Sequence, residues 1–222
     1  MTARTDRETK ILDVAGDMLL RHGYRRVTID DVAGAAGIGK GTVYLHWKTR
    51  EELFGAVFAR EIRGAIADMV TALRADPAVV LLHRFAAEFF LTILRRPLLY
   101  GMVIGDVQMW GKLLGSEAGY DGDRHNIVMA SYVDVLAARG LVRTDLATPE
   151  LTYAFQSVFE GFIYAERGVG LPGTRDERAR LLSITVESAF SRLGTPDAAL
   201  ADEVAALLSG LIRQAGSTNV HT

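Results

Sequence analysis

The stretch Thr28–Leu53, TIDDVAGAAGIGKGTVYLHWKTREEL, decides the fold of this chain. Thr28 is a good N-cap residue, and Asp31 stands three positions later, where a carboxylate completes a capping box. Gly37 follows at the point where a short helix must stop, because glycine adopts a left-handed cap conformation at little cost. Thr49 begins another capping box and opens a further helix. The pattern therefore predicts two short helices joined by a tight glycine turn, followed by a newly capped helix.

Apolar residues recur at helical spacing on one side of both short helices. In the first helix they form an inward face, and in the second helix Val43 and Trp47 would anchor the helix to the core. The opposite side of the second helix carries Gly41, Thr42 and Leu45, with Tyr44 and His46 on its flanks. Small, polar and aromatic groups facing outward suit a major groove about 12 Å wide. The inward residues of the first helix are Ile29, Val32, Ala33 and Ala36.

The same residues carry a family resemblance. Residues 5–55 resemble the N-terminal domain of the TetR family of bacterial transcriptional regulators. The family usually has Phe where Trp47 stands and Ser or Asn where Thr49 stands, and both changes keep the chemistry. The resemblance covers roughly a quarter of the chain, and the remainder fits the family by length and helical character alone. The matching residues are Gly23, Tyr24, Thr28–Ala33, Ala36–Ile38 and Gly41–Leu53.

The resemblance implies a set of DNA contacts. Lys40, Thr42 and Leu45 match positions that meet base edges, where Lys40 would donate to guanine and Leu45 would contact a thymine methyl group. Gly39 and Gly41 weaken the start of the second helix, so they either let it approach the groove closely or leave it partly disordered without DNA. The alternative for each residue taken singly is an ordinary surface or half-core role. The residues expected to touch phosphates are Thr28, Tyr44, His46, Lys48 and Arg50.

A competing motif overlaps this segment. Residues Gly34–Gly41, GAAGIGKG, nearly spell a phosphate-binding P-loop. The match fails at its last position, because Gly41 has no hydroxyl group for a magnesium ion. A P-loop also follows a hydrophobic strand, whereas Thr28–Ala33 is predicted to be helical and carries two aspartates. The pattern favours the helix-turn-helix.

Composition and charge exclude several classes of protein. The chain has 222 residues, no cysteine and five scattered histidines, so we expect no disulfide, thiolate metal site or cofactor. No apolar run approaches the roughly 18 residues of a membrane span, and the charged start does not resemble a secretory signal, so we expect a cytoplasmic protein without membrane contact. The net charge of −2 divides into +3 for residues 1–50 and −5 for residues 51–222. A small basic head on an acidic body fits a DNA-binding protein.

Helix signals continue along the whole chain, and no strand is evident, which predicts an all-α fold of about ten helices. We expect a helix-turn-helix domain over residues 1–50 and a ligand-binding and dimerisation domain over residues 51–222. Thr5 is predicted to cap the first helix, and Thr148, Thr174 and Thr195 to cap later ones. The expected helices after the head are 49–73, a helix opening at Pro77, and helices at about 98–114, 124–138, 149–167, 175–193 and 196–215.

The body is rich in large apolar side chains. Family members use this region as a pocket for a small inducer, and polar residues beside aromatics are candidates to hold such a ligand because a buried carboxylate is costly unless paired. The alternative is that these side chains are simply core. The expected ligand-binding residues are Phe89, Met102, Asp106, Met109, Trp110, Phe155, Phe159 and Glu160.

One helix-turn-helix reads a half-site that is too short for specificity, so we expect a homodimer that reads a palindrome. The resemblance assigns the interface to the helices at 149–167 and 177–193. Burial within the monomer is the alternative for their apolar residues. The expected interface residues are Leu151, Phe155, Val158, Phe162, Ile184 and Phe190.

These observations predict a repressor that binds a double-stranded DNA operator and leaves it when a small-molecule inducer binds the body. A helical ligand-binding or scaffolding protein without specific DNA affinity is the alternative, motivated by the two glycines and the modest charge of the head. No acid, base and nucleophile stand at a spacing that suggests catalysis, so an enzyme is not expected.

Overall fold

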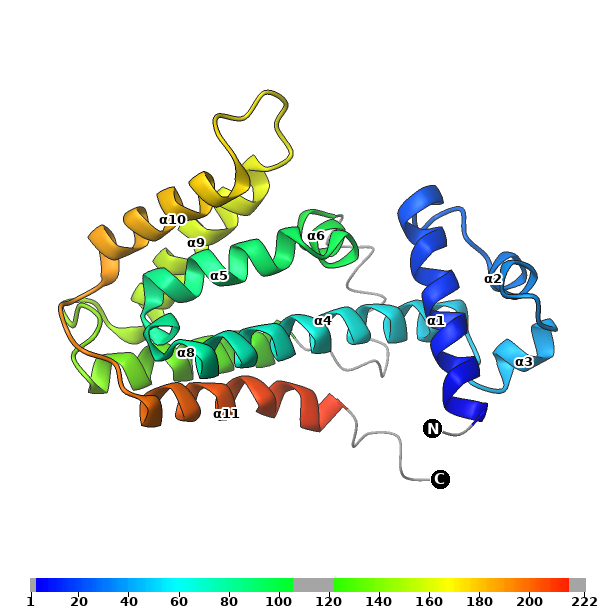
Figure 1. Cartoon of the computed structure of the whole chain (residues 1–222), viewed down its shortest axis with the longest axis horizontal. Coiled ribbons are helices and arrows are strands. Elements are labelled where there is room, and N and C mark those ends of the chain that lie inside the picture. The colour runs from blue at the N-terminus through cyan, green and yellow to red at the C-terminus, as the bar shows by residue number, and fades with distance from the viewer. Residues whose placement is uncertain (1–2, 106–121, 216–222) are drawn as a thin grey trace. The chain divides into compact units, whose positions relative to one another are not determined.

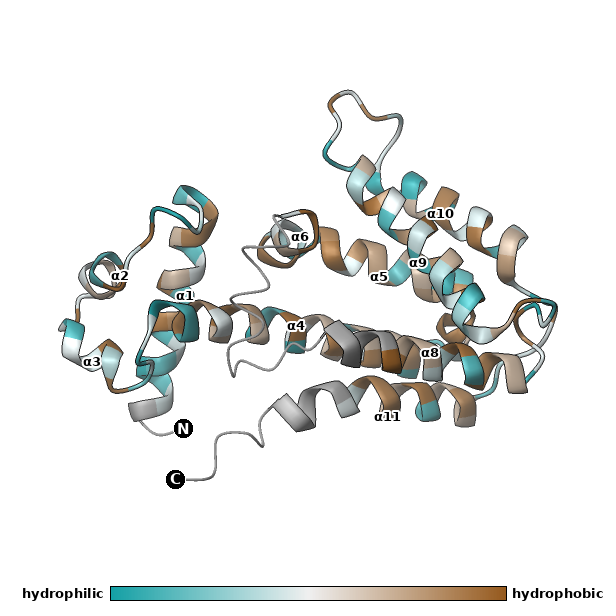
Figure 2. Ribbon diagram, turned by 180° about the vertical axis from the view of Figure 1, so that it is seen from behind, coloured by the Kyte–Doolittle hydropathy of each residue, from teal (hydrophilic) through white to brown (hydrophobic). Residues whose placement is uncertain are grey.

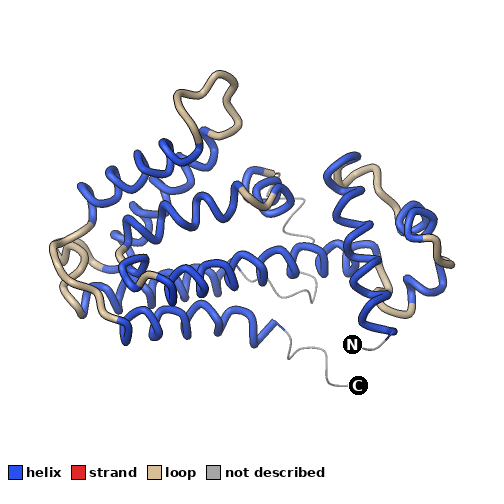
Figure 3. The backbone as a smooth tube through the Cα atoms, viewed as in Figure 1, coloured by secondary structure: helices blue, strands red, loops and turns tan. Residues whose placement is uncertain are grey.

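The computed structural model describes residues 3–105 and 122–215. This part of the chain contains ten α-helices and one short 3₁₀ helix, and it contains no strand (Figure 3). A single isolated bridge pairs Val142 with Ser191. The expected all-α fold is confirmed. In the same ranges, none of the helices is both long enough and apolar enough to cross a membrane.

The chain divides into two compact units. The first comprises Met1–Ile62 and Pro97–Tyr120, and the second comprises Arg63–Arg96 and Asp121–Thr222. The division falls inside the long helix α4 (Arg50–Ala75), whereas the expected boundary after residue 50 lies at its start. The first unit also includes α6 (Pro97–Ile104), which packs against α1 (Ala3–His22).

The first unit is built from α1, α2 (Ile29–Ala36), α3 (Lys40–Tyr44), α6 and the first half of α4 (Figure 1). The helix α1 begins before Thr5, so Thr5 is not its cap, and the Thr9 hydroxyl donates to the Thr5 carbonyl at 2.9 Å. Apolar side chains from the helices of the head meet in one core. Fully buried members of this core include Ile11, Ala15, Val32, Val43, Leu53, Phe54 and Val57.

The second unit contains the other half of α4 with α5 (Leu82–Leu94), α8 (Gly122–Ala138), α9 (Thr148–Ala165), α10 (Arg175–Phe190) and α11 (Ala198–Ala215). The helix α10 packs against α5 and α9, and α11 packs against α8. Figure 2 shows polar and apolar residues intermixed along α9 and α10. Each of these helices has both buried and exposed residues, such as Phe155 and Tyr153 on α9 and Leu182 and Leu181 on α10. Buried core residues include Phe85, Phe90, Tyr132, Leu136, Leu182, Val186 and Val204.

Several helix starts differ from the expectation. Pro77 opens a 3₁₀ turn, η1 (Pro77–Val80), rather than the helix of Phe85, and the chain is extended at Leu81 before α5 begins. A tertiary contact favours this break, because the buried Tyr132 hydroxyl donates to the Val80 carbonyl at 2.7 Å. The last helix is capped by Asp197, whose carboxylate accepts from Leu200 N at 2.8 Å, and not by Thr195.

The caps at Thr148 and Thr174 have different outcomes. Thr174 forms the expected capping box with Glu177. Thr148 lies inside α9, whose N-cap is Ala147, and the Thr148 hydroxyl donates to Asp134 at 2.6 Å instead. A helix start can therefore be shifted by one residue when a neighbouring helix supplies a better partner for the hydroxyl.

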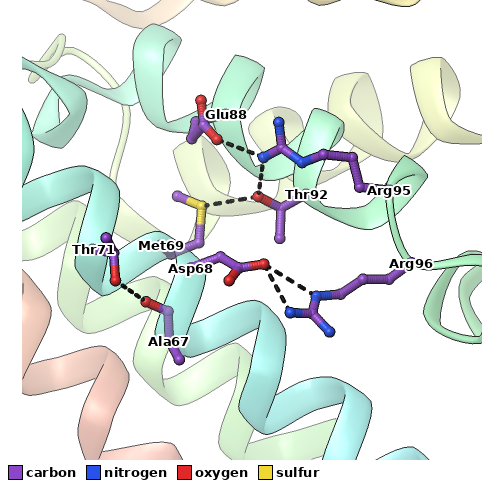
Figure 4. A network of polar contacts seen from close by, with 8 residues as sticks. All are labelled: Ala67, Asp68, Met69, Thr71, Glu88, Thr92, Arg95 and Arg96. Atoms are coloured by element: carbon purple, nitrogen blue, oxygen red, sulfur yellow. Dashed lines mark hydrogen bonds and ion pairs between the residues drawn. The ribbon is translucent and has the colours of Figure 1, made fainter.

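Polar contacts connect the start and the end of the segment Arg63–Arg96 of the second unit (Figure 4). The Arg96 guanidinium, just after α5, donates to Asp68 on α4 at 2.8 Å. A side chain on Gly64 would collide with the Arg96 guanidinium, because a Cβ there would lie 2.5 Å from it. Arg95 donates to both Glu88 and Thr92. The Arg96–Asp68 contact holds the end of α5 against α4, whereas the contacts of Arg95 lie within α5 and its C-cap.

Candidate nucleic-acid interface

The first helix of the motif begins and ends as predicted. Thr28 has an extended backbone, its hydroxyl oxygen accepts from Asp31 N at 3.2 Å, and Thr28 N donates to the Asp31 carboxylate at 2.9 Å. The Thr28 hydroxyl also donates to the Asp31 carboxylate at 2.6 Å, and this bond together with that from Thr28 N holds the pKa of Asp31 below its usual value. Gly37 has φ 66°, in the left-handed region, and Ile38 N donates back to the Ala33 carbonyl at 3.0 Å. The capping box and the glycine stop are both confirmed.

The next helix, α3, is anchored by its inner face. Val43 is completely buried and Trp47, just beyond the helix, is also buried. Leu45 lies opposite and is 74 % exposed, and Tyr44 beside it is exposed as well. Covering such an exposed apolar side chain with a partner would be favourable. The outward face of α3 is therefore available to a ligand.

The two glycines near α3 are not required by packing. A Cβ built on Gly39 or Gly41 meets no atom within 4 Å. Neither residue has a left-handed backbone, so alanine would fit both positions. Gly41, which lies inside α3, costs about 1 kcal/mol of helix stability relative to alanine, whereas Gly39 is the N-cap, where glycine is preferred over alanine. The absence of side chains at Gly39 and Gly41 leaves open space on the outside of the protein next to α3.

Lys40 is engaged within the head. Its Nζ lies 2.7 Å from Asp30 Oδ1, and this contact raises the pKa of Lys40. The ammonium group also lies 5.8 Å from the centre of the Tyr44 ring. Sequence reasoning missed Asp30, because the two residues are ten positions apart and belong to different helices. No local spacing pattern marks such a pair.

His46 and Lys48 have partners in the head. The His46 side chain is mostly buried, and its Nδ1 lies 3.9 Å from Glu8. Lys48 Nζ donates to the Tyr44 carbonyl at the end of α3 at 3.2 Å. Thr49 caps α4 as predicted, because its hydroxyl accepts from Glu52 N at 3.0 Å. Of these side chains, Lys48 remains exposed beside the outward face.

Arg50 differs most from the expectation. Its guanidinium lies 4.1 Å from the centre of the Tyr24 ring and donates to the Val27 carbonyl at 2.7 Å and to the Tyr24 carbonyl. These contacts direct the side chain into the loop between α1 and α2. Two of the five N–H donors of the guanidinium serve these carbonyl groups, which gives Arg50 a structural role. Its expected phosphate contact stays a prediction.

Comparison with known proteins identifies the head. Residues 11–57 match the model of the family described as bacterial regulatory proteins, tetR family. The helix-turn-helix head of this chain therefore resembles the N-terminal domain of that family. An uncharacterised HTH-type transcriptional regulator of Mycobacterium tuberculosis is 46 % identical to this chain over 57 residues, which is 26 % of this chain and 28 % of the relative. The HTH-type transcriptional repressor KstR2 of Rhodococcus jostii is 30 % identical over 91 residues, covering 41 % of this chain and 43 % of the relative.

The likeness in fold extends beyond the matched segment into the body. The fatty acid degradation regulator FadR of Bacillus halodurans superposes with a TM-score of 0.63 at 15 % identity, over 81 % of this chain and 93 % of that one. At this identity the match establishes the fold alone. The sequence matches span less than half of the curated relatives, so the relatives' activities do not transfer directly to the whole chain.

The expected ligand residues of the body fall into several groups. Phe89 and Phe159 stack with ring centres 5.5 Å apart, and Phe155 lies next to Phe159. Met102 is buried, but it belongs to α6 in the first unit. Glu160 is exposed rather than buried among the aromatics. Asp106, Met109 and Trp110 lie outside the described residues.

The expected interface residues also divide. Leu151, Phe155 and Phe190 are buried within the protomer, which places them in its core rather than on a free surface. Val158 and Phe162 are half-buried. Ile184 on α10 is 44 % exposed. Other exposed apolar side chains lie on the outer faces of α9 and α10 outside the expected interface set, namely Tyr153, Tyr164 and Leu181.

Proposed function

We propose that this chain is a DNA-binding transcriptional regulator that reads a palindromic operator as a homodimer. The observation that carries the proposal is the geometry of α3. Val43 and Trp47 fix the helix from inside, while Leu45 stands 74 % exposed on the other side. A short helix presented in this way is the reading element of a helix-turn-helix, and its side chains reach base edges in the major groove.

The outer faces of α9 and α10 support the homodimer. On α9, Tyr153, Ser157, Gly161 and Tyr164 are exposed at helical spacing, so two aromatic side chains flank two small residues. On α10, Leu181 and Ile184 are exposed one turn apart. Exposed apolar and aromatic groups on adjoining helices suit a twofold, self-complementary contact. The proposed interface therefore uses these residues in place of the three buried ones.

The body supports release by a small molecule. The stacked aromatic cluster of Phe89, Phe155 and Phe159 suits an apolar ligand. The hydroxyl of Thr152 on α9 is buried and has no hydrogen-bond partner among the described residues. A ligand that binds one conformation of the dimer more tightly would shift the spacing of the two α3 helices away from the roughly 34 Å between successive grooves. A protein that blocks transcription while bound to its operator and leaves it on binding a ligand is a repressor. We expect this repressor to act on DNA in the cytoplasm.

Fluorescence anisotropy with duplex DNA at increasing salt concentration tests the DNA-binding function. A DNA reader binds, and the logarithm of its affinity falls linearly with the logarithm of the salt concentration. The alternative function is a helical ligand-binding or scaffolding protein, and the same titration distinguishes it from a DNA-binding protein. It would bind no duplex even at low salt, and that result would contradict the proposal.

A further inference from the structure

We propose that Asp30 is a specificity-determining residue of the head. It positions the Lys40 ammonium for a base edge, and it weakens contact between Lys40 and DNA phosphates. This inference rests on the proposed DNA-binding function, and it adds a residue and a role to it. It explains why a head that reads DNA carries an acid next to its reading helix.

The pair is built across the glycine turn. Asp30 lies in the first turn of α2, and Lys40 is the first residue of α3. Their charged atoms are 2.7 Å apart, and the two side chains remain 52 % exposed for Lys40 and 63 % exposed for Asp30. The neighbouring Asp31 has a different task, because its carboxylate accepts the Thr28 hydrogen bonds of the cap. Asp30 is thus the acid that faces Lys40, and both are accessible to DNA.

The chemistry of the ammonium group explains the positioning role. A lysine ammonium has three N–H donors, and Asp30 takes one of them. Two donors remain, and guanine presents two acceptors, O6 and N7, in the major groove. A free lysine side chain has many rotamers, whereas the ion pair holds the Lys40 ammonium at the start of α3. The carboxylate therefore aims the remaining donors in a restricted direction.

The charge of the pair explains the second role. A phosphate that approaches Lys40 also meets the carboxylate of Asp30 at close range, and like charges repel. Because the pair is neutral as a whole, Lys40 releases fewer counterions from DNA than an unpaired lysine would. Binding to random DNA is weakened, while a guanine at the right position still receives the hydrogen bonds. The ratio of specific to non-specific affinity rises as a result.

Selection from a pool of random duplexes, followed by anisotropy at several salt concentrations, tests the role of Asp30. The variants are Asp30→Asn, which removes the charge, and Asp30→Glu, which retains it. Asp17→Asn is the matched control, because Asp17 is an exposed acid on α1 paired with Arg21 and the change in net charge is the same. Lys40→Ala, alone and with Asp30→Asn, shows whether Asp30 acts through Lys40.

We expect Asp30→Asn to bind random duplex about 5-fold more tightly, which corresponds to the repulsion of about 1 kcal/mol between two unit charges about 4 Å apart in water. Its salt slope should steepen by about 0.9 per protomer. Preference for one base per half-site should fall about 5-fold or more, since that is the smaller end of what one good base contact contributes. Asp30→Glu should restore the wild-type slope. In the Lys40→Ala background, Asp30→Asn should leave base preference unchanged.

The possible contrary results are distinct. If Asp30→Asn keeps the wild-type salt slope and the wild-type motif, the role of Asp30 is wrong and DNA binding stands. If Asp17→Asn produces the same changes, net charge rather than the ion pair is responsible, and the role of Asp30 is again wrong. If the wild-type protein enriches no motif, the proposed function fails and this inference fails with it.

Discussion

Arg50 stacks on Tyr24, with the guanidinium carbon 4.1 Å from the centre of the ring. Arg50 is the first residue of α4, and Tyr24 lies in the loop that leads from α1 to α2. The same guanidinium donates to the Val27 carbonyl at 2.7 Å, just before the cap of α2. The Arg50 guanidinium therefore holds the loop before α2 against the start of α4, the helix that follows the helix-turn-helix.

The structural role of Arg50 predicts a stability effect. Arg50→Ala should lower the free energy of unfolding by about 1–3 kcal/mol, because charged hydrogen bonds and a cation–π contact are lost together. Arg50→Lys should recover little of this loss, since an ammonium cannot reproduce the planar fork. Urea unfolding followed by tryptophan fluorescence measures both. Arg21→Lys, at an exposed site on α1, should change nothing. Unaltered stability of Arg50→Ala with a shallower salt slope for DNA binding would favour the phosphate role over the structural one.

The exposure of Leu45 predicts a separation of folding from binding. Leu45→Ala should change the free energy of unfolding by no more than about 0.5 kcal/mol, because the side chain is mostly in water. It should weaken operator binding by about 1 kcal/mol or more, since the DNA would no longer bury that apolar surface. Leu20→Ala, at another exposed leucine in the head, is the control and should affect neither quantity. Equal operator affinity for Leu45→Ala and wild type would mean that α3 does not read the groove.

The open space around Gly41 predicts opposite effects on stability and binding. Gly41→Ala should stabilise the head by up to about 1 kcal/mol, because alanine favours the helix and its Cβ meets no atom of the protein. The same methyl group should weaken DNA binding if α3 lies close to the groove. Gly34→Ala on α2, where a Cβ also meets nothing, controls for helix propensity. Thermal unfolding and anisotropy measure the two effects. A Gly41→Ala protein that binds DNA as well as wild type would refute close approach at this position.

The exposed face of α10 predicts the behaviour of the dimer. Ile184→Asp should convert the protein to monomers, because a charge would be buried in an apolar contact. Sedimentation velocity reports the mass directly. Leu193→Asp is the control, because Leu193 is fully exposed in the segment after α10. A wild-type protein that sediments as a monomer at micromolar concentration, or an Ile184→Asp protein that remains a dimer, would contradict the proposed interface.

The local features of the head were predictable from the sequence. The Thr28 cap, the Gly37 stop and the buried Val43 depend on residues within a few positions of one another, and all three are confirmed. Helical spacing also placed Trp47 correctly. Such features depend on the types of neighbouring residues and on their spacing, and both can be read directly from the sequence.

Features that depend on distant residues could not be predicted in this way. Arg50 finds its partners 23 and 26 positions earlier, and Lys40 finds Asp30 on another helix. The break before α5 accompanies a hydrogen bond from Tyr132, which is 52 positions away from Val80. Periodicity also could not tell core from interface on α9, because Leu151 and Tyr153 are both apolar and only the fold shows which one is covered.

Selection of bound fragments from genomic DNA tests the central claim most directly. The purified protein is mixed with sheared bacterial DNA, bound fragments are recovered at about 0.15 M salt, and their sequences are compared. A homodimer that presents two α3 helices should enrich an inverted repeat whose half-sites are one helical turn apart, or a multiple of it. Recovery of fragments without a shared inverted repeat would contradict the account.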